Sequence, residues 1–275
     1  MHGPSIIARS LSVAVPTGKE GALWQYHSRG DRHSKVACWG IVFDLLLNSA
    51  VLARHAREGR IGFGINHEMR DFENDRKKDL DLVLCTPDPG RALRRRRSLR
   101  SYADEKGIIL STTEKRLLDT LPDLFEAPVG SVEIALEAKA AMTAHVKALP
   151  RLYDELNSSH ATIHGSSDLA IAAGLVMVNL SETFKSFSRS TISRHKQPSD
   201  TERVVEMVKQ LPRRTKTGQA GFDALGIVTV RMTNDGVSQV ELVSEPPAVQ
   251  PGDICHYDSM IQRVVQLYEG RFPRD

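Results

Sequence analysis

Hydrophobic and polar residues alternate along residues 131–139, Ser-Val-Glu-Ile-Ala-Leu-Glu-Ala-Lys. A period of two predicts a strand that packs on a core through its even-numbered positions. The odd-numbered face then carries Glu133, Ala135, Glu137 and Lys139. We therefore expect two carboxylates and an amine to project from this strand into a cleft.

A second strand pattern, residues 79–85, turns its three leucines (80, 82 and 84) one way and Asp79 and Asp81 the other. Asp81 is the better candidate for chemistry because it leads directly into an apolar run. Asp79 stands at the strand entrance beside two lysines, where the alternative is a solvated edge residue. An acid here and the Glu-x-Lys of residues 137–139 can converge on one or two metal ions, since a cation neutralises the repulsion between carboxylates.

Apolar periodicity and breaker residues predict the elements around these strands. Pro150 is expected to kink or split the helix predicted over residues 143–157. The order that results is helix, three strands, helix, strand. The added elements are a helix over residues 36–58 ending at Gly59, a short strand over 61–66, a helix over 143–157 and a buried central strand over 169–180.

With Asp81 on the second strand and Glu137-Ala138-Lys139 on the third, this order resembles the PD-(D/E)xK nuclease superfamily, which has the restriction-endonuclease-like fold. The resemblance covers about residues 36–180. It implies an α/β fold with a mixed sheet flanked by helices, and a magnesium-dependent nuclease. Asp81 and Glu137 would be metal ligands, and Lys139 would orient or activate water.

Many members of that superfamily add an acid from the first helix. Asp44 is the candidate in this chain, with Glu68 as a substitute. Two departures leave the identity of the first acid open: no proline precedes Asp81, and 55 residues separate Asp81 from Glu137.

Positive charge is concentrated inside that long connection, although the net charge of the chain is only +3. The connection is a basic insertion at about residues 86–128, and it starts and ends near the proposed metal site, so its arginines could follow a phosphate backbone. The alternative is a solvated basic face paired with neighbouring acids. The same two interpretations apply to Lys147 and Arg151 on the following helix. The arginines are Arg91, Arg94, Arg95, Arg96, Arg97 and Arg100, and the neighbouring acids are Asp104, Glu105 and Glu114.

Other chemistries find little support. His160 and His164 have i, i+4 spacing but lack the glutamate of a zinc-protease helix, so contact with phosphate at a cleft edge is the better interpretation. Neither a phosphate-binding Gly-rich loop nor a Gly-x-Ser-x-Gly elbow occurs. Three scattered cysteines exclude a disulfide framework, and no apolar run is long enough for a membrane span or a signal peptide. We expect a cytoplasmic protein.

Beyond residue 180 the pattern predicts a C-terminal extension of hairpin and helix. A Ser- and Arg-rich loop over 186–199 leads into an amphipathic helix over 201–211. Strands over 224–232 and 237–243 flank a tight turn, and a helix over 257–268 covers them. Residues 181–275 could extend the nuclease sheet of residues 1–180, form a recognition lobe or build a dimer face.

Three functional classes follow. The chain is predicted to be a restriction- or defence-type DNA endonuclease that uses Mg²⁺, acts as a homodimer and does not bind a membrane. A nuclease of the same fold acting on RNA or branched DNA would share every site residue. A non-catalytic nucleic-acid-binding protein would use Glu133, Glu137 and Lys139 only in surface ion pairs.

Overall fold

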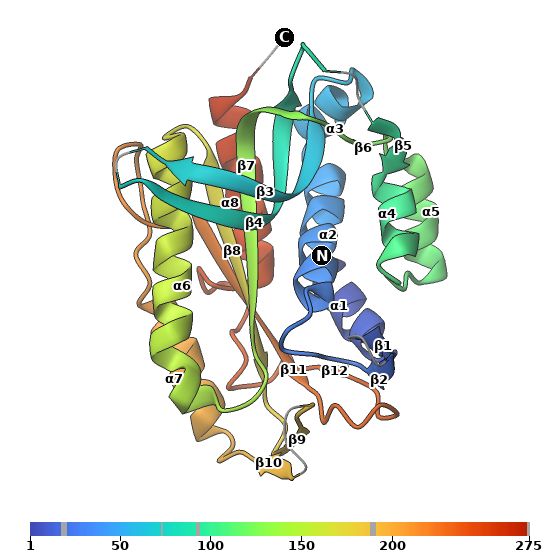
Figure 1. Ribbon diagram of the computed structural model, residues 1–275, viewed down its shortest axis with the longest axis vertical. Helices are drawn as coiled ribbons and strands as arrows, with labels where there is room; N and C mark the ends of the chain where they lie inside the picture. The colour runs from blue at the N-terminus through green and yellow to red at the C-terminus, as the bar shows by residue number, and fades with distance from the viewer. Residues whose placement is uncertain (18–20, 73, 92–93, 188–190, 274–275) are drawn as a thin grey trace.

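Within the described residues, an eight-stranded mixed sheet forms the centre of the molecule (Figure 1). The structure is a computed structural model that describes residues 1–17, 21–72, 74–91, 94–187 and 191–273, except for the side chains of residues 94–96. Strands β7, β8 and β11 run parallel to one another, and β4 is antiparallel to both of its neighbours, β7 and β3. The strand order is β12 (Glu241–Leu242), β11 (Ala224–Arg231), β8 (Ile171–Asn179), β7 (Val129–Ala141), β4 (Arg76–Pro87), β3 (Gly62–Asp71), β6 (Phe125–Glu126) and β5 (Arg94–Ser98).

Helices cover both faces of this sheet (Figure 1). Along β7, Ile134 and Leu136 pack in the core on one face, whereas Ala135 packs in the core on the other. The predicted α/β class with helices flanking a mixed sheet is therefore confirmed. One face carries α1 (Gly3–Leu11), α2 (Arg32–Asn48), α3 (Ala50–Arg57) and α8 (Tyr257–Arg271), and the other carries α6 (His145–Ser166) and α7 (Ser199–Lys209).

The helix predicted over residues 36–58 is in fact two helices. The chain turns by 101° between α2 and α3. Ser49 adopts an extended conformation there, and its hydroxyl accepts a hydrogen bond from the backbone N–H of Leu52 at 3.1 Å. A serine N-cap of this kind starts a new helix, and the apolar periodicity alone does not reveal it.

The helix predicted over 143–157 is one continuous helix, α6, that passes through Pro150 and extends to Ser166. Leu156 and Ile163 are seven residues apart and both pack against the sheet, so apolar burial continues through the additional turns. Its C-terminal end meets the β3–β4 hairpin, where the N–H of Phe72 donates to the carbonyl of Gly165 (Figure 1).

The C-terminal region extends the sheet, which is one of the three roles left open for it. Strand β11 pairs in parallel with β8, and α8 packs on β11 as predicted. The predicted tight hairpin is wrong, because β12 pairs with β11 over only two residues and a nine-residue connection, 232–240, joins them. Asn234 explains the difference: it is buried, and its side chain bonds to the backbone of Tyr26 and Lys185.

The insertion between β4 and β7 is folded against the sheet edge next to β3. Ser98 and Ser111 begin its two helices with reciprocal capping boxes. Two further small hairpins lie outside the main sheet. The insertion comprises β5, α4 (Leu99–Glu105), α5 (Thr112–Thr120) and β6, and the hairpins are β1 (Val15–Thr17) with β2 (Ala22–Trp24), and β9 (Thr183–Lys185) with β10 (Ile192–Arg194).

No single helix in the described residues is both long and apolar enough to cross a membrane. Helices α2 and α3 reach that length and composition only as a sharply bent pair.

Candidate active site

Strands β4 and β7 separate at Asp81, in the middle of the sheet. The two strands pair from Pro87 opposite Val129 as far as Leu82 opposite Leu136. Beyond that point, in the described part of the chain, β4 continues only with β3, and residues 137–141 of β7 pair only with β8. The point of separation leaves one edge of β7 without a neighbouring strand.

The β3–β4 ladder is also interrupted here. Ile65 pairs with Leu82 and His67 pairs with Leu80, so Asn66 and Asp81 between them are left out of the register. Asn66 has a φ of 49°, a left-handed conformation that Asn tolerates better than most residues. As a result Leu80 packs on the α6 face while Leu82 packs on the α2 face, so the three leucines of β4 do not share one face as predicted.

The Asp81 carboxylate is held by donors from two elements. Oδ1 accepts from the Ser34 hydroxyl at 2.7 Å and from Lys35 Nζ at 2.9 Å, both on α2, and Oδ2 accepts from the N–H of Ala138 at 3.0 Å. Lys35 Nζ also donates to the side chain of Asn66 and to the Asp81 carbonyl. Burial opposes the charged form, but the Lys35 ammonium and these hydrogen bonds hold the pKa of Asp81 below its ordinary value.

Glu137 and Lys139 form an ion pair on the α6 side of the same gap. Lys139 Nζ lies 2.8 Å from Glu137 Oε1 and 3.8 Å from a carboxylate oxygen of Glu155 on α6. Lys78 Nζ of β4 lies 3.8 Å from the same Glu137 oxygen. The Glu137 side chain is only 2% exposed, whereas that of Lys139 is 26% exposed, so the lysine and not the acid meets solvent.

Glu137 retains an unused acceptor in this arrangement. Its Oε2 is buried and has no hydrogen-bond partner among the described residues. Burial raises the pKa of Glu137, with Lys139 opposing the rise and the negative charge of Asp81 adding to it. A buried carboxylate oxygen without a donor is costly, which makes this atom a place where a cation or a proton would bind.

The structure therefore brings Asp81, Glu137 and Lys139 to one gap between two strands, in line with the sequence prediction of neighbouring strands. The predicted open cleft is wrong in one respect, because Glu133 and Glu137 are both buried. The Glu133 carboxylate accepts a hydrogen bond from the Thr86 hydroxyl at 2.5 Å, and Glu133 lies four residues before Glu137 on β7.

Asp44 does not join this group. Its carboxylate accepts hydrogen bonds from the backbone N–H groups of His2 and Gly3 and from the Tyr257 hydroxyl, all at 2.7–3.1 Å. Burial raises the pKa of Asp44, with these hydrogen bonds opposing the rise. The assignment of Asp44 as a metal ligand is thus corrected: this acid anchors the start of α1.

The alternative acids are at the surface. Glu68 and Asp79 are opposite each other in the β3–β4 ladder, and Glu68 forms an exposed ion pair with Lys77 at 2.8 Å. Asp79 is exposed. Of the acids left open by the sequence, Asp81 is the one adjacent to the Glu-x-Lys strand.

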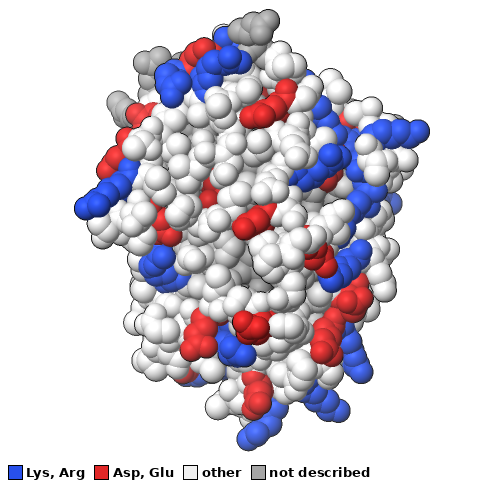
Figure 2. Space-filling model, turned by 180° about the vertical axis from the view of Figure 1, so that it is seen from behind, with Lys and Arg blue, Asp and Glu red and all other residues white. Residues whose placement is uncertain are grey.

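The basic residues divide into paired and unpaired ones. Arg97 forms ion pairs with Glu105 and Glu126, and Arg100 forms ion pairs with Asp119 and Asp123. Arg91 lies 3.8 Å from Asp88, and the side chains of the three arginines at positions 94–96 are outside the described part. Arg151 is 84% exposed and bonds to Glu155 one turn later, whereas Lys147 is exposed at the start of α6. Figure 2 shows charges of both signs interspersed over the face opposite to that of Figure 1.

Sequence reasoning missed Lys35, Asn66 and Lys78. Lys35 is 1% exposed, and it stands one residue before the apolar run that defined the predicted helix. A lysine surrounded by an apolar helix pattern is a signal of a buried ion pair, because a lone buried ammonium is strongly unfavourable. His33 is also close to the cluster, and burial lowers its pKa to about 4 even though Asp81 opposes the change.

The two other histidines singled out by spacing join α6 to the loop before β11. His164 Nε2 donates to the carbonyl of Gly221 at 3.0 Å, and His160 Nδ1 accepts from the N–H of the same glycine at 3.2 Å. Both bonds are structural links between elements of the fold.

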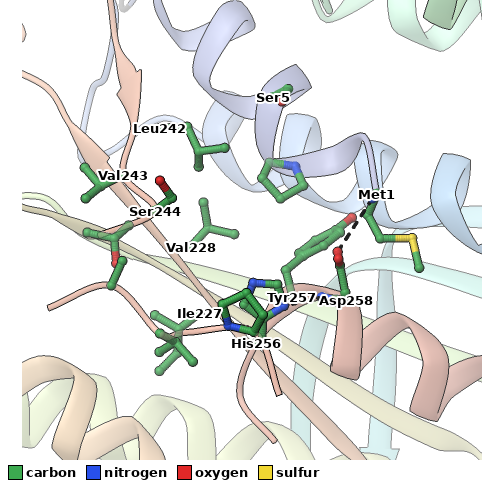
Figure 3. A pocket seen from close by; sticks show the side chains of 15 residues that line it. Met1, Ser5, Ile227, Val228, Leu242, Val243, Ser244, His256, Tyr257 and Asp258 are labelled. Carbon is green, nitrogen blue, oxygen red and sulfur yellow. Dashed lines mark hydrogen bonds and ion pairs between the residues drawn. The ribbon is translucent and has the colours of Figure 1, made fainter. Parts of the chain in front are cut away.

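A separate cavity of about 200 Å³ lies away from this cluster (Figure 3). It is bounded by the start of α8, with Tyr257 and Asp258, and by Val228, Leu242 and Val243 from the sheet edge. The cavity is therefore adjacent to the Asp44 anchor and does not contain Asp81, Glu137 or Lys139.

Comparison of the chain with models of protein families, with curated proteins and with solved structures finds no match.

Proposed function

We propose that the chain is a magnesium-dependent DNA endonuclease with its active centre at Asp81, Glu137 and Lys139. The observation that carries the proposal is the gap between β4 and β7, where two acids and a lysine lie on adjacent strands and one carboxylate oxygen of Glu137 is buried without a partner among the described residues. The element order α2, β3, β4, β7, α6, β8 supports the resemblance to the restriction-endonuclease-like fold.

The donors present are suited to Mg²⁺. No three His, Cys, Asp or Glu side chains are grouped as ligands in the described part of the chain. Mg²⁺, however, commonly takes one or two carboxylates and fills its octahedral shell with water and substrate phosphates. Glu137 Oε2 has no partner, and Asp81 Oδ2 accepts one hydrogen bond, so each acid retains acceptor capacity. When bound, the ion would polarise the phosphate and lower the pKa of water.

The side chains of the cluster would have different roles in catalysis. Asp81 and Glu137 hold negative charge at fixed positions, because donors from α2 and β7 fix the first and Lys139 fixes one oxygen of the second. The Lys139 ammonium is partly exposed, and Glu137 raises its pKa despite burial, so it stays charged at neutral pH. It would orient the attacking water and stabilise charge that develops on the phosphate.

The test is conversion of supercoiled plasmid to nicked or linear DNA with Mg²⁺ and with EDTA. We expect cleavage only with Mg²⁺, and a loss of about two or more orders of magnitude in turnover for Glu137→Gln and Lys139→Ala. Glu133→Gln is the matched control, since this buried acid lies on the same strand outside the cluster. Unchanged turnover in both cluster variants, or an equal loss in the control, would contradict the assignment.

A nucleic-acid-binding protein without catalysis is the second candidate. It is favoured by charge balance, because Lys35, Lys78 and Lys139 neutralise three acids: Asp81, Glu137 and Glu155. Calorimetric titration with Mg²⁺ or Mn²⁺ separates the two candidates: DNA binding with neither metal binding nor cleavage supports the second. Repeating the cleavage assay on single-stranded RNA and on a four-way DNA junction tests for a nuclease of the same fold that acts on RNA or branched DNA.

A further inference from the structure

A groove lined by basic side chains opens at the start of α6. Figure 1 shows that this end of α6 lies near α7 and β10. The volume of the groove is about 430 Å³. Residues 143–147 line it on one side, and residues 191–196 with the first turns of α7, about 45 residues later in the sequence, complete it. We refer to it as the α6 groove.

The α6 groove has an excess of positive charge. Lys147, Arg194, Lys196 and Arg203 line it and are exposed. Within the described residues none of these four forms an ion pair, and Asp200, the acid in the lining, accepts a hydrogen bond from the backbone N–H of Lys196 at 2.8 Å. Four cations against one acid form a site for an anion.

The start of α6 adds backbone donors to this charge. Its N-cap is Ala144, in a left-handed conformation with a φ of 52°, and it provides no side-chain acceptor. The first turn of this 22-residue helix also contains no acid, in contrast to α7, which begins with Asp200 and Glu202. The N–H groups and the positive end of the helix dipole are thus available to an anion in the groove.

His145 supplies a buried polar atom without a partner. Its side chain is 2% exposed, and its Nε2 donates to the carbonyl of Asn179 at 2.8 Å, so the lone pair of the neutral ring is on Nδ1. Nδ1 has no partner among the described residues. Burial and the His195 ring, 4.6 Å away, lower the pKa of His145, and the Asn179 carbonyl and Asp200 oppose them. A phosphate oxygen beside Nδ1 would favour its protonation and gain a hydrogen bond.

The groove and the catalytic cluster lie along one strand edge. After Lys139, the β7 edge that lacks a strand neighbour leads to Ala141 and then to the groove at Thr143. Four residues of extended chain span about 13 Å. Measured along the helix axis of a duplex, about 13 Å corresponds to about four phosphates of one strand. A single nucleic-acid strand can therefore occupy both places.

We infer that the α6 groove binds a backbone phosphate of the nucleic acid whose phosphodiester is cleaved at the Asp81–Glu137–Lys139 cluster. The inference rests on the proposed function for the cleavage step alone. Phosphate binding in the groove depends on its own cations, helix N-terminus and His145.

The test is fluorescence anisotropy of a labelled duplex oligonucleotide in EDTA, which removes cleavage from the readout. One variant replaces Lys147, Arg194, Lys196 and Arg203 with Gln. The matched control replaces Arg57, Lys115, Arg116 and Lys216, four exposed cations away from the groove, and has the same net charge. We expect affinity at least about tenfold weaker for the groove variant at about 0.1 M salt, with a flatter salt dependence. Equal losses in both variants would overturn the inference.

A second variant addresses His145. In His145→Gln the side-chain amide can still donate to the Asn179 carbonyl, but Nδ1 is gone. Wild-type affinity should increase as the pH falls from 8 to 6, and this increase should shrink in the variant but persist in His195→Gln. Inorganic phosphate should compete only weakly, and competition as strong as that of the oligonucleotide would indicate a small phosphorylated ligand and overturn the inference. Loss of cleavage in Glu137→Gln with this binding unchanged would separate the two sites.

Discussion

The two acids of the candidate site are both at least partly buried, but their pKa values shift in opposite directions. The Asp81 carboxylate accepts hydrogen bonds from three donors, Ser34, Lys35 and Ala138, and its pKa is lowered although burial opposes the change. Glu137 has one close lysine and a bare oxygen, and its pKa is raised. Asp81 is thus integrated in the fold, whereas Glu137 has a charged form that a bound cation would stabilise.

Thermal unfolding should distinguish these two roles. Asp81→Asn leaves the Lys35 ammonium, which is 1% exposed, without its counter-charge, so we expect a loss of about 3 kcal/mol in unfolding free energy at pH 7. Glu137→Gln should change the melting temperature by only a few degrees, about what 1 kcal/mol produces in a domain of this size. Differential scanning calorimetry of both variants measures the contrast.

The pH dependence follows from the direction of each shift. Asp81 has a lowered folded-state pKa, so it contributes stability at pH values above the ordinary aspartate pKa of about 3.9. This stability is lost as the pH falls through the folded-state pKa. Glu137, with a raised pKa, removes stability as the pH rises from about 4.3 through its folded pKa. Equal melting temperatures for the two variants between pH 4 and pH 8 would show that the acids are equivalent.

At the scale of elements, the insertion at the sheet edge separates arginines with structural partners from the rest of the basic run. Arg97 bonds to Glu105 and Glu126 and lies over the ring of Tyr102, so its charge is already used within the fold. Of the acids expected to pair with the run, Glu105 pairs with Arg97, whereas Arg100 pairs with Asp119 and Asp123 and Glu114 pairs with Arg9. The neighbouring arginines at positions 94, 95 and 96 remain candidates for phosphate contact.

Replacing Arg94, Arg95 and Arg96 with Ser should weaken nucleic-acid binding and flatten its salt dependence. Each lost phosphate contact reduces the slope of log affinity against log salt by about 0.9 on duplex DNA. Arg97→Ser is the matched control, and it should lower thermal stability more than it lowers affinity. The measurement is affinity at several salt concentrations. An unaltered slope in the triple variant would show that these arginines form a solvated face and do not contact phosphate.

The sequence revealed the elements through periodicity, and it missed what depends on single polar contacts between distant segments. Alternation along residues 131–139 located β7 correctly, but it did not predict that Glu133 and Glu137 are buried. The break at Ser49 depends on one hydroxyl that caps the next helix, and the turn at Asn234 is held by backbone groups of Tyr26 and Lys185. Lys35 was missed for the same reason, because its partners Asn66 and Asp81 come from other elements.

At the scale of the whole molecule, the C-terminal half of the chain carries several exposed apolar side chains. Val237, Leu242 and Ile254 are 81%, 43% and 66% exposed, and β12 is a two-residue strand at the edge of the sheet. The two-residue edge strand offers little backbone for strand pairing, but the exposed apolar side chains are a surface on which a second copy of the chain could pack.

A restriction-type enzyme needs two active centres facing opposite DNA strands, so we expect a symmetric homodimer on DNA whose dyad matches a palindromic site. Sedimentation velocity with and without a duplex measures the state. Val237→Asp together with Leu242→Asp should shift it toward monomer, because a buried unpaired carboxylate opposes association. Phe72→Asp, at an equally exposed position on the β3–β4 hairpin, is the control and should leave it unchanged. A chain that remains monomeric on DNA yet linearises plasmid in one step would contradict the symmetric arrangement, whereas a monomer that only nicks would favour action on RNA or branched DNA.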